Sequence, residues 1–339
     1  MIPPPLSKAT EATVELLPQM TATGEGVVIT VVKQRFQITP KGTTTRAPGA
    51  KVNVTDVPWD EDKPETSSLK LPSDLCIHKP GTDVVVAASA MAKGRAKVRQ
   101  LDVGLRIGSL QKVLRVFGLR VWYRGLTGIV LSDPQVFEEV PLRWEYAWGG
   151  RDDSDPKKPL EEPRNPAGRG VTREPASLLG KPGPAIEDVA HLVSTCKSSP
   201  PPMGVGPIGR HWMPRRKYAG TYDETWKKTR MPLPPDDFDP RFDQAAPPDQ
   251  IANGYLRGGE QVGLHNLCAD GPLVFELPRL AFFVGSRLDG KLVEHRTAMD
   301  TVVLLPNERA FEMTWRAVVP VPRKTYRLEG IQVHEKRIL

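Results

Sequence analysis

Residues 26–38 read Gly-Val-Val-Ile-Thr-Val-Val-Lys-Gln-Arg-Phe-Gln-Ile, and β-branched side chains dominate this stretch. Gly24, Gly26 and Pro40 bound it. β-Branched residues suit the pleated surface of a strand, whereas glycine and proline interrupt one. Because helical spacing fits the apolar positions poorly, the stretch predicts a long β-strand.

Other strands are predicted on both sides of this one. Residues 83–92 indicate a second buried strand that enters a turn at Lys93-Gly94, and the alternation of Arg95, Lys97 and Arg99 with small and apolar residues predicts a strand with a basic, exposed face. Residues 111–123 resemble two short strands around a tight turn at Gly118. Strand patterning returns near the C-terminus, at residues 271–277, 280–284, 301–305 and 311–319.

The middle of the chain predicts ordered loops. The sequence has 35 prolines in 339 residues, which is about twice the usual frequency of roughly 5%. Most of them lie between residues 134 and 248, beside Gly, Asp and Trp, and short helices are predicted near residues 222–229 and 240–246. We therefore expect a mainly β protein, an antiparallel sandwich or open-barrel-like set of sheets with long Pro/Gly-rich ordered loops and a few short helices.

We expect residues 1–339 to form a single domain. In this interpretation residues 20–132 are β-rich, residues 133–250 are a loop-rich insertion, and residues 251–335 are β-rich again. A chain of this length with 39% hydrophobic residues can bury a full core.

Composition excludes or disfavours several functional classes. The longest apolar or small stretch, residues 84–92, is far below the roughly 20 residues that a membrane helix needs. The N-terminus lacks the pattern of a secretory signal, so we expect a cytoplasmic protein without a membrane partner.

Cys76, Cys196 and Cys268 are too far apart for a metal knuckle, and we expect buried, reduced thiols. The net charge of +7 favours acidic partners, but 40 acidic residues are mixed with the basic ones, so nucleic acid is not indicated.

The densest functional pattern is residues 206–226, which read Gly-Pro-Ile-Gly-Arg-His-Trp-Met-Pro-Arg-Arg-Lys-Tyr-Ala-Gly-Thr-Tyr-Asp-Glu-Thr-Trp. Arginine interleaved with Trp and Tyr is typical of protein interfaces and also of nucleic-acid surfaces. A third interpretation is that the aromatic residues anchor loops to the core while the arginines bridge backbone carbonyls. The candidate partner-binding residues here are Trp212, Arg215, Arg216, Tyr218, Tyr222 and Trp226.

A second aromatic pattern occupies residues 141–152 and 162–169. Arg143, Glu145 and Arg151 are candidates for an ion-pair network that holds Trp144 and Trp148 in place. The alternative is a groove for a peptide, so Trp144 and Trp148 are also candidate partner-binding residues.

Catalytic and metal patterns are weak. His211 with Asp223 or Glu224 resembles a general base and its orienting acid, but no nucleophile motif accompanies it. Asp236, Asp237, Asp239 and Asp243 lack the spacing of a calcium loop, and Asp239-Pro240 is more typical of a helix start. The pair Cys76 and His78 has no second pair to complete a tetrahedral site. We expect no enzyme activity, no metal and no cofactor, with a hydrolase that uses His211 and the aspartates as the alternative.

Several phrases of the sequence resemble the bacterial DUF2169 family. They are Ser73–Leu75 with Lys79–Val84, Pro141–Gly150, Arg164–Gly168, Gly206–Trp212, Pro234–Asp239, Ala246–Gln250 and Leu256–Glu260. The resemblance implies an adaptor or chaperone of the type VI secretion system, which binds a cognate effector and helps to load it onto the VgrG or PAAR spike. It also implies a function carried by a surface rather than by a reactive group, with nucleic-acid binding or unrecognised enzyme activity as alternatives.

Overall fold

The strand predicted at residues 26–38 is confirmed as β3 (Gly26–Ile38) in a computed structural model that describes residues 3–126, 128–321 and 327–337. It lies inside a six-stranded sheet whose other members are β2 (Thr13–Met20), β4 (Thr44–Ala47), β7 (Asp83–Val86), β23 (Ala298–Leu305) and β24 (Ala310–Pro320). The order is β2-β3-β24-β23-β7, with β4 also paired to β3. All these pairings are antiparallel except that of β7 with β23. β3 reads as a nearly continuous apolar run because both of its faces are covered.

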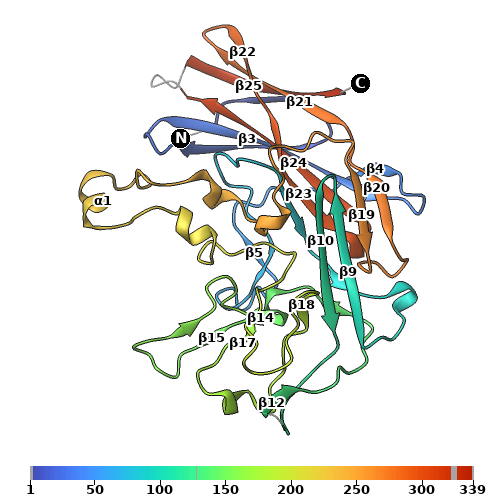
Figure 1. Cartoon of the computed structure of the whole chain (residues 1–339). Helices are drawn as coiled ribbons and strands as arrows, with labels where there is room; N and C mark the ends of the chain where they lie inside the picture. Colours follow the sequence, from blue (N-terminus) through green and yellow to red (C-terminus); the bar gives the residue numbers. More distant parts are fainter. Residues whose placement is uncertain (1–2, 127, 322–326, 338–339) are drawn as a thin grey trace.

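Two further sheets flank this main sheet (Figure 1). An antiparallel five-stranded sheet has the order β18 (Ile186–Asp188), β10 (Leu110–Phe117), β9 (Gln100–Ile107), β19 (Gln261–His265) and β20 (Leu273–Glu276). A four-stranded sheet has the order β1 (Leu6–Ala9), β25 (Leu328–Arg337), β21 (Leu280–Leu288) and β22 (Lys291–His295), with β1 parallel to β25. In the described ranges each of the three sheets is an open row of strands, which confirms the mainly β fold class.

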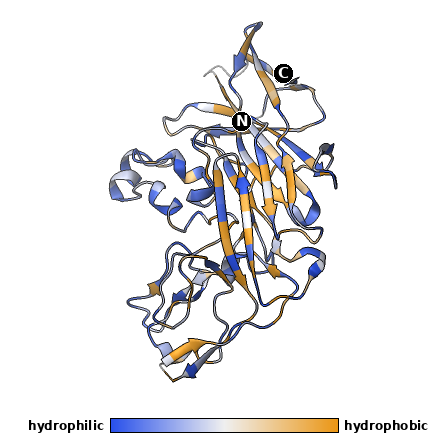
Figure 2. Ribbon diagram, turned by 45° about the vertical axis from the view of Figure 1, so that its right-hand side comes forward, coloured by the Kyte–Doolittle hydropathy of each residue, from blue (hydrophilic) through white to orange (hydrophobic). Residues whose placement is uncertain are grey.

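Aromatic contacts join the three sheets into one core. Phe275 of β20 stacks on Phe311 of β24 with ring centroids 4.9 Å apart, and Phe282 of β21 meets Trp315 of β24 at 4.8 Å. Large buried side chains of this kind dominate core energetics. Figure 2 shows the hydrophobic residues concentrated along these central strands.

The middle third of the chain contains only short elements. Its strand pairs are β14 (Trp148–Gly149) with β17 (Arg169–Gly170), and β15 (Arg151–Asp152) with β16 (Leu160–Glu161). It forms a lower lobe in Figure 1 together with the hairpin of β11 (Trp122–Gly125) and β12 (Gly128–Leu131). A second, smaller core fills this lobe with the buried side chains of Trp122, Ile129, Trp148, Leu178 and Val193.

The remaining elements are short. The two-stranded pairs are β5 (Val57–Pro58) with β6 (Leu69–Leu71) and β8 (Ser89–Ala90) with β13 (Val140–Pro141). The predicted helix near residues 222–229 is confirmed as α1 (Glu224–Thr229). The 3₁₀ turns are η1 (Lys93–Arg95), η2 (Trp144–Tyr146), η3 (Pro175–Leu178), η4 (Arg215–Tyr218), η5 (Pro240–Asp243), η6 (Pro248–Gln250) and η7 (Pro306–Glu308). None of the helices in the described ranges has the length and apolar character needed to cross a bilayer.

The predicted basic strand at Arg95–Arg99 is wrong. Gly94 and Arg95 adopt positive φ angles of 67° and 54° in the turn η1, and β9 begins only at Gln100. Arg95 pairs with Glu139 at 3.0 Å and Lys97 with Glu138 at 3.6 Å, so the basic face is largely neutralised. The left-handed turn that Gly94 permits therefore replaces the strand that the alternating basic residues predicted.

The predicted hairpin around Gly118 is also wrong. β10 pairs with β9 and β18, while β11 pairs with β12. Gly118 is needed because another backbone passes close to it: a Cβ at this position would lie 1.8 Å from the carbonyl oxygen of Gln135. The glycine therefore marks a close approach of two segments rather than a tight turn.

Two smaller predictions need correction. The single buried strand expected at residues 83–92 is two strands, β7 and β8, which pair with β23 and β13 respectively. All three cysteines are free thiols, but only Cys76 and Cys268 are buried, whereas Cys196 is half-buried.

Candidate functional site

A long excursion, residues 209–246, leaves the main body and carries α1 at its far end (Figure 1). We call it the arm. It contains η4, α1 and η5 and corresponds to the densest aromatic and basic pattern of the sequence. Figure 2 shows that its outer part is mainly hydrophilic.

Arg215 fastens the root of the arm. Its Nη1 donates to the carbonyl of Ile208 at 2.6 Å and its Nε donates to the carbonyl of Phe242 at 2.9 Å. The side chain is buried, and burial lowers the pKa of its guanidinium. Arg215 therefore bridges the incoming and outgoing chains of the arm, as the anchoring interpretation of the sequence described.

The outer part of the arm is held by local contacts. Asp223 caps α1 by accepting from the backbone N–H of Trp226 at 2.8 Å, and the Trp226 indole donates to the carbonyl of Leu233, also at 2.8 Å. Tyr222 packs edge-on against Trp226, with ring centroids 4.6 Å apart. Arg230 Nη2 donates to the carbonyl of Ala22 at 2.7 Å, which ties the arm to the turn between β2 and β3.

The predicted partner-binding residues of the arm fall into two groups. Arg215 is buried, Trp212, Tyr218 and Trp226 are half-buried, and Arg216 and Tyr222 are exposed. The rings of Trp212 and Tyr218 are engaged from within the chain, by Trp144 and by the guanidinium of Arg241. Partner binding by these residues stays a prediction. Exposed residues of the arm include acidic ones such as Glu224 and Asp236. From the exposed residues we select Arg216, Lys217, Tyr222, Lys228 and Met231, and we call this set the arm surface.

The cations of the arm surface are unbalanced. Arg210 is paired with Asp56 and Arg230 with Asp236. Within the described ranges, however, Arg216, Lys217 and Lys228 have no carboxylate within 4.0 Å. This surface is therefore positively charged toward solvent.

The second aromatic pattern is built into the interior. Trp144 and Trp148 are both buried, and the Trp144 indole donates to the carbonyls of Gly206 and Pro207 at 3.2 and 3.1 Å. Asn165 Nδ2 donates to the carbonyls of both tryptophans at 2.9 and 3.0 Å. Both indoles therefore pack in the interior in this structure, and partner binding by these two residues stays a prediction.

The predicted ion-pair network of Arg143, Glu145 and Arg151 is wrong. Arg151 pairs with Asp153 and Glu161, the Glu145 carboxylate accepts from Ser68, and the Arg143 guanidinium lies over the ring of Trp59. The three residues face different neighbours because Arg143 precedes the short turn η2, Glu145 lies within it, and Arg151 lies beyond it in β15. A cavity of about 430 Å³ lies beside β14 and β17, and peptide binding there stays a prediction.

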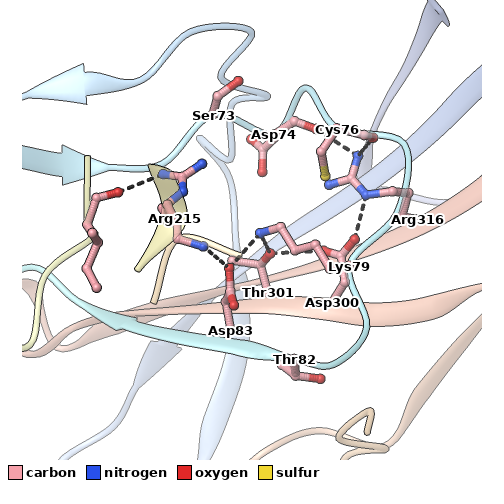
Figure 3. A network of polar contacts seen from close by, with 12 residues as sticks. Ser73, Asp74, Cys76, Lys79, Thr82, Asp83, Arg215, Asp300, Thr301 and Arg316 are labelled. Carbon is pink, nitrogen blue, oxygen red and sulfur yellow. Dashed lines mark hydrogen bonds and ion pairs between the residues drawn. The ribbon is translucent and has the colours of Figure 1, made fainter. Parts of the chain in front are cut away.

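A buried polar network lies where the arm returns to the main sheet (Figure 3). Lys79 Nζ donates to Asp83 Oδ2 at 3.0 Å and to Thr301 Oγ1 at 2.8 Å. Asp83 Oδ2 also accepts from the backbone N–H of Ala245 at 2.8 Å. Arg316 Nε donates to Asp300 at 2.5 Å, and its Nη1 donates to the carbonyls of Asp74 and Cys76.

The pKa values in this network follow from burial and ion pairing. Burial raises the pKa of the Cys76 thiol to about 12, in spite of the nearby guanidinium of Arg316. Burial opposes the charge of Lys79, but the carboxylates of Asp83 and Asp300 outweigh it and raise the pKa of the ammonium group. Asp243 at the end of η5 has its pKa raised by burial, although Arg210 opposes this. Lys79 therefore stays charged and Cys76 stays a thiol at neutral pH.

The residues singled out for catalysis and metal binding are separated. His211 is exposed and makes no side-chain hydrogen bond to any described residue. Asp237 binds the backbone N–H and the hydroxyl of Thr221, and Asp239 caps η5 as the sequence predicted. His78 is exposed whereas Cys76 is buried. In the described ranges no group of three or more His, Cys, Asp or Glu residues is arranged to hold a metal ion.

Reasoning from the sequence missed the charges inside the main sheet. Asp300 and Arg316 form a buried pair between β23 and β24, and Lys33 of β3 contacts Asp74 and Glu312 at 2.9 and 3.3 Å. The available signal was a charged residue inside an otherwise apolar strand. Such a residue needs a buried partner, but its identity depends on which strands are neighbours.

Two of the phrases on which the family resemblance rests lie at these junctions. Residues 79–84 supply Lys79, Thr82 and Asp83 to the network. Residues 246–250 end in Gln250, whose Nε2 donates to the carbonyls of Val84 and Val205 at 2.8 and 3.0 Å. These two phrases therefore help to fix loops to the main sheet.

One protein family matches the chain. The family model described as an uncharacterized protein conserved in bacteria (DUF2169) matches residues 23–316. These residues include the lower lobe, the whole arm, and the main sheet apart from β2 and the last residues of β24. No curated protein and no solved structure gives a significant match.

Proposed function

This chain belongs to the DUF2169 family, and we propose that it is a cytoplasmic adaptor or chaperone of the bacterial type VI secretion system. In this proposal it binds a cognate effector and helps to load it onto the VgrG or PAAR spike. In this proposal the chain catalyses no reaction and needs no cofactor. Its role is to protect the bound surface of the effector and to deliver the effector to the spike.

The observation that supports this function best is the arm. It extends from the body, is fixed at its root by the buried Arg215, and presents an aromatic ring and three unbalanced cations on its surface. A preformed surface loses little conformational entropy on binding, and Tyr and Arg are among the residues that contribute most at interfaces. These properties suit the capture of another protein.

The charge of the arm surface favours an acidic effector segment. Arg95 and Lys97, in the segment that was expected to present a basic face, are paired with Glu139 and Glu138. We therefore assign the electrostatic steering of the effector to Arg216, Lys217 and Lys228. Charge complementarity at these residues would raise the association rate of the two proteins and make that rate depend on salt. Tyr222 and Met231, which are 55% and 64% exposed, add apolar contact area.

The test is co-expression of this protein with the product of the adjacent downstream gene, followed by purification and mass spectrometry of the complex. A stable stoichiometric complex, with the partner insoluble when expressed alone, is the expected result. The double variant Arg216→Glu/Lys228→Glu should weaken the complex by about 10-fold or more, because charge reversal in an interface is costly.

The matched control is Arg106→Glu/Arg287→Glu, which makes the same charge change at two exposed strand positions away from the arm. This control should bind the partner like the unmodified protein. Absence of a complex would overturn the adaptor function, and equal weakening by both double variants would remove the arm from it.

A further inference from the structure

The hairpin of β11 and β12 ends in an apolar turn at the bottom of the lower lobe (Figure 1). Leu126 in this turn is 107% exposed, so its side chain has no more cover than in an extended peptide. Figure 2 shows hydrophobic residues at the same end of the molecule. The leucine side chain therefore projects from the lobe instead of packing on it.

Leu126 is not an isolated apolar residue. Tyr123 of β11 is 49% exposed, and Val130 of β12 lies opposite it in the antiparallel register. A Cβ on Gly125 would lie 3.0 Å from Cγ2 of Val130 and 4.0 Å from Cε2 of Tyr123, so both side chains lie beside this glycine. The outer face of the hairpin thus continues the apolar turn. We call Tyr123, Leu126 and Val130 the hairpin tip.

The inner face holds the hairpin in place. Trp122 and Ile129 are 2% and 7% exposed and belong to the second core. The backbone N–H of Trp122 donates to the carbonyl of Lys181, and that of Cys196 donates to the carbonyl of Ile129, both at 3.1 Å. Because chain segments pair with the hairpin on both sides, the hairpin tip is presented in a preformed geometry.

The charges around the hairpin tip are positive. Residues 119–132 contain no Asp or Glu. Arg124 is exposed, and in the described ranges no carboxylate lies within 4.0 Å of its guanidinium. Lys181 and Lys197, on the segments that flank the hairpin, are exposed and equally lack such a partner among the described residues. The apolar tip is therefore surrounded by unbalanced cations.

This combination suits a lipid surface. A stable protein interface buries about 800 Å² on each partner, and a projecting tip of three apolar side chains offers little of that area. The nearby cavity of about 430 Å³ is lined by neither Tyr123 nor Leu126, so it does not bring a small molecule to the tip. A bilayer needs no shape complementarity: tyrosine is enriched at its interface, and anionic headgroups attract nearby Lys and Arg.

We propose that the hairpin tip is a peripheral contact with an anionic lipid surface. Leu126 enters the boundary between the headgroups and the acyl chains, Tyr123 lies at the level of the headgroups, and Arg124, Lys181 and Lys197 attract the lipid phosphates. Such a contact needs no membrane-spanning segment. It replaces the expectation that the chain has no membrane partner, and it does not depend on the arm or on effector capture.

The test is co-sedimentation of the full chain with vesicles of phosphatidylcholine that contain one-third phosphatidylglycerol, and with vesicles of phosphatidylcholine alone. Binding to the anionic vesicles should be stronger by about 10-fold or more, and it should weaken when the salt is raised from about 0.05 M to about 0.5 M. Arg124→Gln/Leu126→Asn should weaken binding to the anionic vesicles by about 10-fold or more, because it removes one cation and the projecting apolar side chain.

The matched control is Arg287→Gln/Leu292→Asn, which makes the same two changes at exposed positions of β21 and β22, at the opposite end of the molecule in Figure 1. Its binding should stay within about twofold of that of the unmodified chain. Both double variants alter exposed side chains, and circular dichroism spectra that match the unmodified chain should show that they fold.

The inference is overturned if the anionic vesicles are not bound, if both kinds of vesicle are bound equally, or if both double variants lose binding equally. Loss of effector capture in Arg124→Gln/Leu126→Asn, without any vesicle binding by the unmodified chain, would assign the hairpin tip to a protein interface instead. Since the vesicle assay contains no effector, failure there leaves the adaptor proposal untouched.

Discussion

The ammonium group of Lys79 lies 3.0 Å from the carboxylate of Asp83, and both side chains are almost fully buried (Figure 3). The same carboxylate oxygen accepts the backbone N–H of Ala245, where the arm ends. Lys79 also donates to Thr301 of β23. This ion pair therefore joins β7, β23 and the arm, and its geometry fixes the place at which the arm meets the main sheet.

Replacing Asp83 by asparagine should destabilise the chain strongly. The amide can still accept from Ala245, but it leaves the Lys79 charge buried without its carboxylate. The expected loss in the free energy of unfolding is about 3–5 kcal/mol, measured by urea denaturation at neutral pH.

The control for this change is Glu138→Gln, which removes one partner of the exposed pair between Lys97 and Glu138. Its cost should be below about 1 kcal/mol. A similarly small cost for Asp83→Asn would mean that the buried pair does not hold this junction together.

Arg215 and Arg216 are adjacent arginines with opposite expected roles. Arg215→Ala removes two donors from carbonyls at the arm root and should cost about 3 kcal/mol in unfolding free energy. Arg216→Ala alters an exposed side chain and should change that free energy by no more than about 0.5 kcal/mol. Equal effects of the two substitutions on stability would contradict the anchoring role of Arg215.

Thiol labelling should distinguish the three cysteines. Cys196 is half-buried, whereas Cys76 and Cys268 are buried, and the pKa of Cys76 is raised to about 12. Because the thiolate is the reactive form, Ellman's reagent at pH 8 should label Cys196 first in the native protein, with Cys76 slowest. Unfolding in guanidinium chloride should make all three thiols reactive with the reagent, and Cys196→Ser should remove the fast phase of labelling. Labelling of Cys76 at the rate of Cys196 would contradict its burial.

Stability should fall at alkaline pH partly through Cys76. Its thiol has a folded pKa of about 12, above the ordinary value of 9.0 that it regains on unfolding. The unfolded chain therefore releases a proton that the folded chain keeps, so this group's stabilising effect is lost as pH rises from about 9 toward 12, by up to about 1.4 kcal/mol per pH unit.

Cys76→Ser removes this titration and should flatten the decline in unfolding free energy, measured in urea between about pH 8 and pH 10.5. The raised pKa of Lys79 acts in the same direction and is present in both proteins, so it does not account for a difference between them. Parallel pH curves for the two proteins would show that the Cys76 thiol does not contribute.

The sequence predicted many strands correctly because the residues that favour a strand lie within the strand itself. β3 has the predicted bounds, and the expected strands at residues 280–284, 301–305 and 311–319 lie within β21, β23 and β24. Asp239 begins η5 as predicted, because an aspartate followed by proline provides both the cap and the first helical residue. The errors at Arg95–Arg99 and Gly118 arose where a left-handed turn or a passing backbone segment overrode the local pattern.

The candidate site was predictable in location but not in detail. The sequence placed the aromatic and basic residues at 206–226, and the arm lies there. It did not separate the buried Arg215 from the exposed Arg216. That difference depends on the contacts of Arg215 with Ile208 and Phe242, which only the folded chain brings together.

The sequence by itself determined the mainly β class, the position of the longest strand and the membership of a bacterial family, because composition, β-branched runs and characteristic phrases are properties of short segments. Only the tertiary structure decided strand partners and burial. β3, for example, pairs with β24, and more than two-thirds of the chain's length separates the two strands in the sequence. The pairing of such distant strands lowers the free energy only when the whole core forms, so no local stretch encodes it.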